Sequence, residues 1–313
     1  MSAHGGLQSA HAESHRRRKP LNETVQPYVY LFPLLLIYTV FIIYPAIRTF
    51  ALSLYEIDGI AINAPSHFVG FGNFTRMFQS ELFYHAFLHN IYWMLLSLVI
   101  PIGFGLVLAV ILGHRHTRGR NLFRTIFFLP QVLTIVAVGL IWSWMYNPRY
   151  GPINIVLKAI GLKRLAIPWL GDYTAALFAI FISYAWAYYG FCMVIFLAGI
   201  QSIDETLYDA AKVDGANEYR QFISVTIPGL RNAFTTIVLV TLINSFKIFD
   251  LIRVITNGGP GDSTYVISFL LYSRVFYWDD VGFGASVAVA NTAIIVIIST
   301  VYLLYRRRVE KAW

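Results

Sequence analysis

Six long, charge-poor apolar windows constrain the fold of this chain more than any other feature. Each reaches or exceeds the roughly 20 residues that a helix needs to cross a bilayer. Hydrophobic residues make up 57% of the chain, more apolar surface than one soluble core can bury. The windows lack the alternation of a membrane barrel. They predict an all-α integral membrane protein with six transmembrane helices, at 28–49, 91–112, 126–146, 173–199, 232–256 and 284–305.

The placement of Lys and Arg predicts the orientation. With the N-terminus in the cytoplasm, 15 of these cations lie on the inner side and six on the outer side. That bias favours two cytoplasmic termini. We expect a cytoplasmic polar tail at 1–27, a six-helix membrane domain at 28–305 and a basic cytoplasmic tail at 306–313. One outer loop goes against the bias, because it carries Arg149, Lys158, Lys163 and Arg164.

The charge balance and the motif search exclude several functions. The net charge of +8 is explained largely by the inner cation clusters, which suit anionic membrane lipid and give no reason to expect nucleic acid. Phosphate-binding loops, H-E-x-x-H and G-x-S-x-G motifs are all missing from the sequence. We therefore expect no enzyme activity, no cofactor and no metal. Asp279 and Asp280, an acidic pair beside Trp278, fit a solvated helix start.

Cysteine and histidine add no chemistry to this picture. Cys192 is the only cysteine, so an intramolecular disulfide is excluded. The three histidines of the N-terminal tail, at 4, 11 and 15, are too sparse to predict a metal site.

A polar excursion at 201–231 interrupts the apolar pattern. Ser202 to Glu205 has the form of a capping box, so a helix is expected to start there, and Gly215 can end it in a left-handed turn. Asn217 can cap a second short helix that Pro228 stops. Acidic residues outnumber basic ones, and Ala210 with Ala211 permits close approach of another backbone. The excursion is either a docking element for a partner or an ordinary solvated loop.

These residues resemble a known family. Leu207 to Ala216, followed by Phe222, Ile227 and Pro228, is similar to the E-A-A-x-x-x-G loop of the membrane subunits of bacterial binding-protein-dependent ABC importers. The resemblance continues through 198–203, 249–252, 256–261 and 283–286, which look like the carbohydrate branch and its subunit equivalent to the larger maltose permease. Asp209 stands where the family usually has Glu, so the carboxylate is kept but is one methylene shorter.

The resemblance implies a function. The chain is expected to be an inner-membrane permease subunit that forms half of a pore with a second, different permease. A separate ATPase, in two copies, is expected to bind the excursion as a coupling helix, and an extracytoplasmic solute-binding protein is expected to deliver a sugar-like substrate. The ATPase-coupling residues by this resemblance are Tyr208, Asp209, Ala210, Ala211, Asp214, Gly215 and Ala216.

The resemblance also places a substrate path on the fourth and fifth windows. Aromatic faces and hydroxyl or amide groups in these windows suit a sugar, although they equally suit packing between helices. The side chains at the matching positions are mostly of other types, so a site is implied without its specificity. The path residues are Ala187, Tyr188, Phe191, Thr241, Asn244, Ser245, Lys247 and Ile248.

Two questions stay open at this point. A buried charge is costly in a membrane, and Asp250 lies three residues from Lys247, so Asp250 either neutralises Lys247 as a structural pair or leaves it as a ligand for substrate. A stand-alone channel or secondary transporter is the other functional class. Such a transporter is expected to contain an internal repeat or two matching broken spans, and neither is visible in the sequence.

Overall fold

A computed structural model describes residues 21–57, 59, 66–113 and 119–311. It divides into two compact units, Met1–Arg48 and Thr49–Trp313. The described part of the first unit is helical: α1 (Leu21–Tyr38) continues through a π-helical turn (Thr39–Ile43) into α2 (Tyr44–Leu52), whose end begins the second unit. Pro27–Leu52 is a candidate membrane span. The helix therefore begins inside the predicted polar tail, whose histidines lie outside the described residues.

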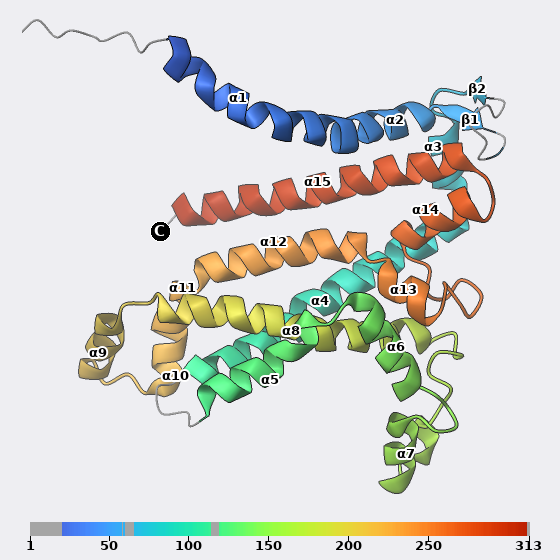
Figure 1. Cartoon of the computed structure of the whole chain (residues 1–313). Helices are drawn as coiled ribbons and strands as arrows, with labels where there is room; N and C mark the ends of the chain where they lie inside the picture. Colours follow the sequence, from blue (N-terminus) through green and yellow to red (C-terminus); the bar gives the residue numbers. More distant parts are fainter. Residues whose placement is uncertain (1–20, 58, 60–65, 114–118, 312–313) are drawn as a thin grey trace, which may run out of the picture. The chain divides into compact units, whose positions relative to one another are not determined.

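Three further long helices are apolar enough to cross a membrane. They are α4 (Glu81–Gly113), α8 (Ala176–Gln201) and α15 (Val281–Lys311), drawn in Figure 1 in cyan, yellow and red. The structure is thus mostly helical, with four continuous candidate spans. The other two predicted spans are broken helix pairs.

The third window is not one helix, contrary to the prediction. It forms α5 (Arg120–Val132) and α6 (Ile135–Met145), which meet at an angle of 96°. Leu133 adopts an extended conformation, and the Thr134 hydroxyl accepts a hydrogen bond from the Ala137 backbone N–H at 3.3 Å. A new cap directly after a helix end starts a second helix in a new direction.

The fifth window is also divided. α10 (Glu218–Gln221), a π turn (Phe222–Thr226) and α11 (Ile227–Gly229) precede α12 (Arg231–Lys247), with a bend of 64° at Leu230. α12 ends at Lys247, and a separate helix, α13 (Asp250–Ile255), follows. The prediction of one continuous helix over 232–256 is therefore wrong at its C-terminal end.

α8 is the centre of the second unit. In its most apolar window 72% of residues are buried, compared with 6% for α15. Its main partner is α4, and at their crossing a Cβ on Gly105 would lie only 2.6 Å from the Cβ of Cys192. Glycine is required there because small residues let membrane helices approach closely. Nearer the N-terminal ends of both helices the Trp93 ring meets Phe181 edge to face, with centroids 5.3 Å apart.

The segments between spans contain short elements. A two-stranded antiparallel sheet, β1 (Tyr55–Ile57) with β2 (Ser66–Phe68), is an addition to the predicted all-α fold. α3 (Gly72–Gln79) follows it, α7 (Pro152–Ala159) and a 3₁₀ turn (Lys163–Leu165) lie between α6 and α8, and α14 (Ile267–Phe276) precedes α15. Asn73 joins the sheet to α3, since its side-chain amide donates to the carbonyls of Ser53 and Tyr55.

The acidic pair at 279–280 starts α15, as the sequence indicated. The Asp280 carboxylate accepts from the Phe283 backbone N–H at 3.2 Å. It also forms an ion pair with Arg76 at 2.7 Å, which ties the beginning of α15 to α3. Asp280 is therefore a structural cap.

Candidate functional site

The excursion at 201–231 forms a compact helical hairpin. α9 (Glu205–Val213) begins with Asp204 as its cap, whose carboxylate accepts from the Thr206 N–H at 2.9 Å. The predicted capping box at Ser202 is wrong by two residues, because the Ser202 hydroxyl donates to the Gly199 carbonyl and so finishes α8. Hydrogen bonds from Thr206 hold the pKa of the Asp204 carboxyl below its usual range.

The predicted turn after α9 is confirmed. Gly215 has φ +76°, and its N–H donates to the Lys212 carbonyl, while the Ala216 N–H donates to the Ala211 carbonyl. These two bonds form a Schellman motif, which favours glycine at the left-handed position. Asn217 then caps α10 by accepting from the Arg220 N–H at 2.9 Å, as expected.

Two contacts hold the two arms of the hairpin together. The Tyr208 and Thr226 hydroxyls lie 3.0 Å apart, which joins α9 to the second arm. The Ile203 side chain lies directly against Gly229. The second arm ends at Gly229, one residue after Pro228. The hairpin is therefore one compact unit, and its second arm leads directly into α12.

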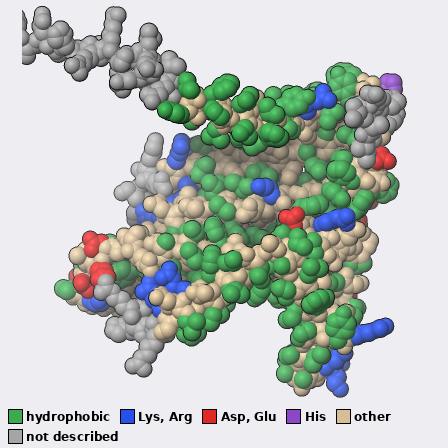
Figure 2. Space-filling model, viewed as in Figure 1, with side chains coloured by type: hydrophobic (Ala, Val, Ile, Leu, Met, Phe, Trp, Pro, Cys, Tyr) green, Lys and Arg blue, Asp and Glu red, His purple; other side chains and the backbone are tan. Residues whose placement is uncertain are grey.

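The outward surface of the hairpin is both acidic and apolar. No residue of α9 is buried; Asp209, Ala210 and Asp214 are exposed, and Ala211 and Ala216 are half-buried. Red acidic atoms gather at this end of the molecule in Figure 2. Three large apolar side chains accompany them, with exposed fractions of 53% for Leu207, 88% for Val213 and 73% for Tyr219.

The sequence interpretation missed these three side chains. The prediction of a docking element was based on the acidic residues and on the small size of Ala210 and Ala211, and it left out the apolar residues of the same segment. Exposed apolar side chains beside charged ones are typical of a contact surface for another protein.

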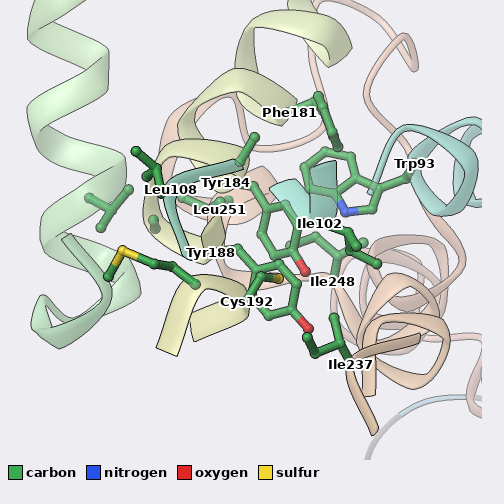
Figure 3. Close-up of a cluster of buried hydrophobic side chains, with 14 of the residues drawn as sticks. Trp93, Ile102, Leu108, Phe181, Tyr184, Tyr188, Cys192, Ile237, Ile248 and Leu251 are labelled. Carbon is green, nitrogen blue, oxygen red and sulfur yellow. The ribbon is translucent and has the colours of Figure 1, made fainter. Parts of the chain in front are cut away.

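The predicted substrate path centres on contacts between α8 and α12. The Tyr188 and Thr241 hydroxyls lie 3.0 Å apart, and both residues are buried. The Tyr188 ring stacks on Tyr184, with centroids 5.1 Å apart, and on Phe191 at 5.5 Å. Figure 3 shows the Tyr184 and Tyr188 rings side by side within the apolar cluster.

The structure does not bring all the predicted path residues to one surface. Ala187 and Ile248 are buried in the apolar core, and Ser245 is fully buried, with its hydroxyl donated to the Thr241 carbonyl at 2.8 Å. Phe191 and Asn244 are half-buried, and Lys247 is exposed. Among the predicted path residues, only Phe191, Asn244 and Lys247 are therefore not buried.

Three side chains from other helices hold the end of α12. Asn90 donates to the Ser245 carbonyl at 2.7 Å and accepts from the Ile267 N–H at 2.8 Å. Ser268 and Asn291 donate to the Phe246 carbonyl at 3.0 and 3.1 Å. A helix that ends inside a membrane leaves carbonyls that protein groups must satisfy. Asn90 was not predicted, because it directly precedes the second apolar window.

The structural pair of Lys247 with Asp250, one of the two alternatives, is not formed. Within the described part of the chain neither side chain makes an ion pair or a hydrogen bond, and both are exposed. The spacing argument assumed one helix, but Ile248 is extended (ψ 123°) and separates α12 from α13. Arg253 instead donates to the Asn257 side chain, with its guanidinium 5.3 Å from the Tyr272 ring centroid.

The hollow between α4 and α8 does not suit a sugar. Its volume is about 360 Å³, and its lining is almost entirely apolar, from Trp93, Leu96, Phe178 and Phe181 among others. A sugar requires donors and acceptors for its hydroxyls. The polar groups on the α12 side fit that requirement better.

Comparison with known proteins places the chain in a family. The trehalose/maltose transport system permease protein MalF of Thermococcus litoralis is 32% identical, over 88% of this chain and 92% of that protein. The diacetylchitobiose uptake system permease protein NgcF of Streptomyces coelicolor is 35% identical, over 77% of this chain and 71% of that protein. Both relatives extend along most of the membrane domain.

A solved structure has the same fold. A bacterial alginate ABC transporter in complex with an alginate pentasaccharide-bound periplasmic protein contains a chain that matches with a TM-score of 0.81 and 23% identity, over 93% of this chain and 98% of that chain. Residues 105–313 match the family model for the inner membrane component of binding-protein-dependent transport systems. The chain belongs to this family and is a multi-pass membrane permease subunit of a binding-protein-dependent transport system.

Proposed function

We propose that this chain forms half of the translocation path of an ATP-driven importer for a sugar or sugar derivative. The other half is a second, different permease subunit, and two copies of a separate ATPase supply the energy. An extracytoplasmic solute-binding protein delivers the substrate to the outer loops. The hairpin at 201–231, which is compact, exposed and followed directly by α12, is the observation that carries the proposal.

The substrate class is supported by the relatives and by the site. The two relatives above are named for trehalose, maltose and diacetylchitobiose, and the solved complex contains an alginate pentasaccharide. In this chain the Tyr188 ring stacks on Phe191, the Tyr188 hydroxyl lies 3.0 Å from that of Thr241, and Asn244 follows Thr241 by three residues on the same helix. A stacking face beside hydrogen-bonding groups is the chemistry that a carbohydrate needs.

The membrane arrangement that we propose has six spans, two of them bent, with both termini and the hairpin in the cytoplasm. The excess of Lys and Arg near the termini and around α5 and α10 supports it. The bend at Leu230 lies between the hairpin and α12. Movement of the docked hairpin therefore acts as a lever on the helix that carries Thr241 and Asn244.

The hairpin proposal is tested by replacing its most exposed apolar side chain. Val213→Asp adds a charge where an apolar contact with the ATPase is expected, and it leaves every described hydrogen bond of the hairpin in place. In the reconstituted complex we expect substrate-stimulated ATP hydrolysis and uptake to fall together, while the chain still inserts in the membrane. Val213→Ala is the matched control and retains most of both activities.

Gly215→Glu and Ala211→Arg test the same surface by changing its shape, at the turn after α9 and at a small side chain of α9. A side chain at Gly215 is strained by the positive φ, and a long cation at Ala211 prevents close approach. Both variants are expected to uncouple hydrolysis from uptake. Wild-type coupling in Val213→Asp and in these two variants means that the ATPase does not bind here. Failure of an ATPase to co-purify with the wild-type chain rejects the importer assignment itself.

A further inference from the structure

We propose that the α7 segment, residues 149–165, is an interfacial anchor that inserts an apolar face into the bilayer surface and binds anionic phospholipid headgroups. It lies at the end of α8 opposite to the hairpin, because it precedes α8 in the chain whereas α9 follows it. This inference does not depend on the transported substrate.

The exposed face of α7 is apolar, which is the reverse of a helix on a water-soluble surface. Asn154 is buried against the rest of the chain. The outward stripe is Pro152, Ile155, Val156 and Ala159, with Val156 55% exposed. Positions spaced by three and four residues form one face of a helix. A helix with its polar residue inside and its apolar stripe outside fits hydrocarbon better than water.

α6, the helix before α7, also carries an outward apolar stripe. Val136, Leu140 and Trp144 follow at intervals of four residues and are exposed, Trp144 at 70%. Figure 1 shows α7 projecting beyond α6, away from α4 and α8, and green apolar atoms cover this projection in Figure 2. Tryptophan and tyrosine favour the membrane–water interface. The proposed anchor places the exposed side chains of Trp144 and Tyr150 at that interface.

The charges of the segment have a single sign. Residues 145–171 contain no Asp or Glu and four cations: Arg149, Lys158, Lys163 and Arg164. All four are exposed, and within the described residues none forms an ion pair. Blue atoms mark the tip of the projection in Figure 2. Cations beside an inserted apolar face are attracted to anionic headgroups.

The segment is preformed, so lipid binding does not have to fold it. The Asn154 amide donates to the Ile167 carbonyl at 3.0 Å and accepts from the Trp169 indole at 2.9 Å. The Tyr146 hydroxyl donates to the Ala179 carbonyl and ties the segment to α8. Gly161, with φ +84°, ends α7. Because these inward contacts fix the helix, its apolar stripe cannot turn inward.

Depth-dependent fluorescence quenching tests the insertion. In a Cys192→Ala background, a fluorophore on Val156→Cys is compared with one on His67→Cys, an exposed polar position of β2. The permease is assembled in nanodiscs of phosphatidylcholine and phosphatidylglycerol. We expect lipid carrying a shallow spin label to quench the Val156 label several-fold more than the His67 label, and aqueous iodide to do the opposite.

The charge requirement is tested in the same assembly. In Lys163→Gln with Arg164→Gln, quenching of the Val156 label by spin-labelled phosphatidylglycerol relative to spin-labelled phosphatidylcholine is expected to fall, by up to about fivefold for each cation removed. Arg220→Gln, which removes a cation from the hairpin, should leave that ratio unchanged. Iodide quenching of Val156 equal to that of His67 overturns the proposal. Shielding of Val156 from both quenchers also overturns it, because another protein then covers the stripe.

Discussion

The hydroxyls of Tyr188 and Thr241 lie 3.0 Å apart and join α8 to α12 at the buried centre of the membrane domain. This bond fixes the side of α12 that carries Asn244 relative to the aromatic stack of α8. Tyr188 therefore orients the predicted path more than it lines it, and the residues of the path should differ sharply in their mutational effects.

The substitutions Asn244→Ala and Ser245→Ala are expected to differ most clearly in their effects on uptake. Asn244→Ala removes a half-exposed amide that can reach a sugar, so we expect about two- to tenfold weaker substrate interaction, equivalent to 0.5–1.5 kcal/mol per hydrogen bond. Ser245→Ala is the control, since its hydroxyl bonds only to the Thr241 carbonyl of its own helix. Uptake at several sugar concentrations is the measurement. Equal losses in both variants, or none in either, mean that the path lies elsewhere.

Asn90 is expected to stabilise the end of α12 and the start of α14. Asn90→Leu leaves the Ser245 carbonyl and the Ile267 N–H buried without this partner, at a cost of about 1–3 kcal/mol for each group. We expect a clear drop in the thermal unfolding temperature of the purified protein. His85→Leu on the same helix is exposed and serves as the control. An unchanged unfolding temperature for Asn90→Leu contradicts this role.

Lys247 distinguishes a structural charge from a functional one. Because the structure contains no ion pair with Asp250, Lys247→Met should be expressed and inserted like the wild type. Its transport preference should change, whereas Lys247→Arg should retain the wild-type preference. Membrane abundance and uptake of neutral and acidic sugars are the measurements. A large loss of Lys247→Met protein from the membrane would instead support a structural role for the Lys247 charge.

The two caps of the hairpin should respond differently to acid. The pKa of Asp204 is lowered in the folded state, so its contribution to the stability of α9 is present above the unfolded value of 3.8 and is lost as the pH falls through the folded value. Asn217, which caps α10, does not titrate. Hydrogen exchange corrected for intrinsic rates should accelerate at Thr206 below about pH 4, and Arg220 serves as the internal reference. Equal pH responses at both caps refute the assignment.

Reporter fusions test the orientation. A reporter active only in the cytoplasm should be silent when fused within 145–172 and active after Asn217 or Arg308. The fusion within 145–172 is the most stringent test, because the four cations of that loop oppose the charge bias. Cytoplasmic activity there rejects the six-span arrangement with both termini inside.

The sequence by itself determined the class of the protein, most of the span positions and the turn chemistry of the hairpin. These follow from local physics: a bilayer demands about 20 apolar residues, and Gly215 and Asn217 act through their own backbone and side chain. The family resemblance of Leu207 to Ala216 could be recognised for the same reason, because it rests on residues that are adjacent in the sequence. Even there, the helix start was misplaced, because Ser202 bonds backward to Gly199 while Asp204 bonds forward to Thr206.

Only the tertiary structure decided where the spans break and which residues face outward. The end of α12 is stable because Asn90, Ser268 and Asn291, distant in sequence, satisfy its free carbonyls. Once α12 ends at Lys247, the spacing that suggested a pair with Asp250 no longer applies. Likewise, the apolar stripe of α7 faces outward because Asn154 is held inside by Ile167 and Trp169. Such long-range hydrogen bonds have no local signature, so periodicity alone could not predict their consequences.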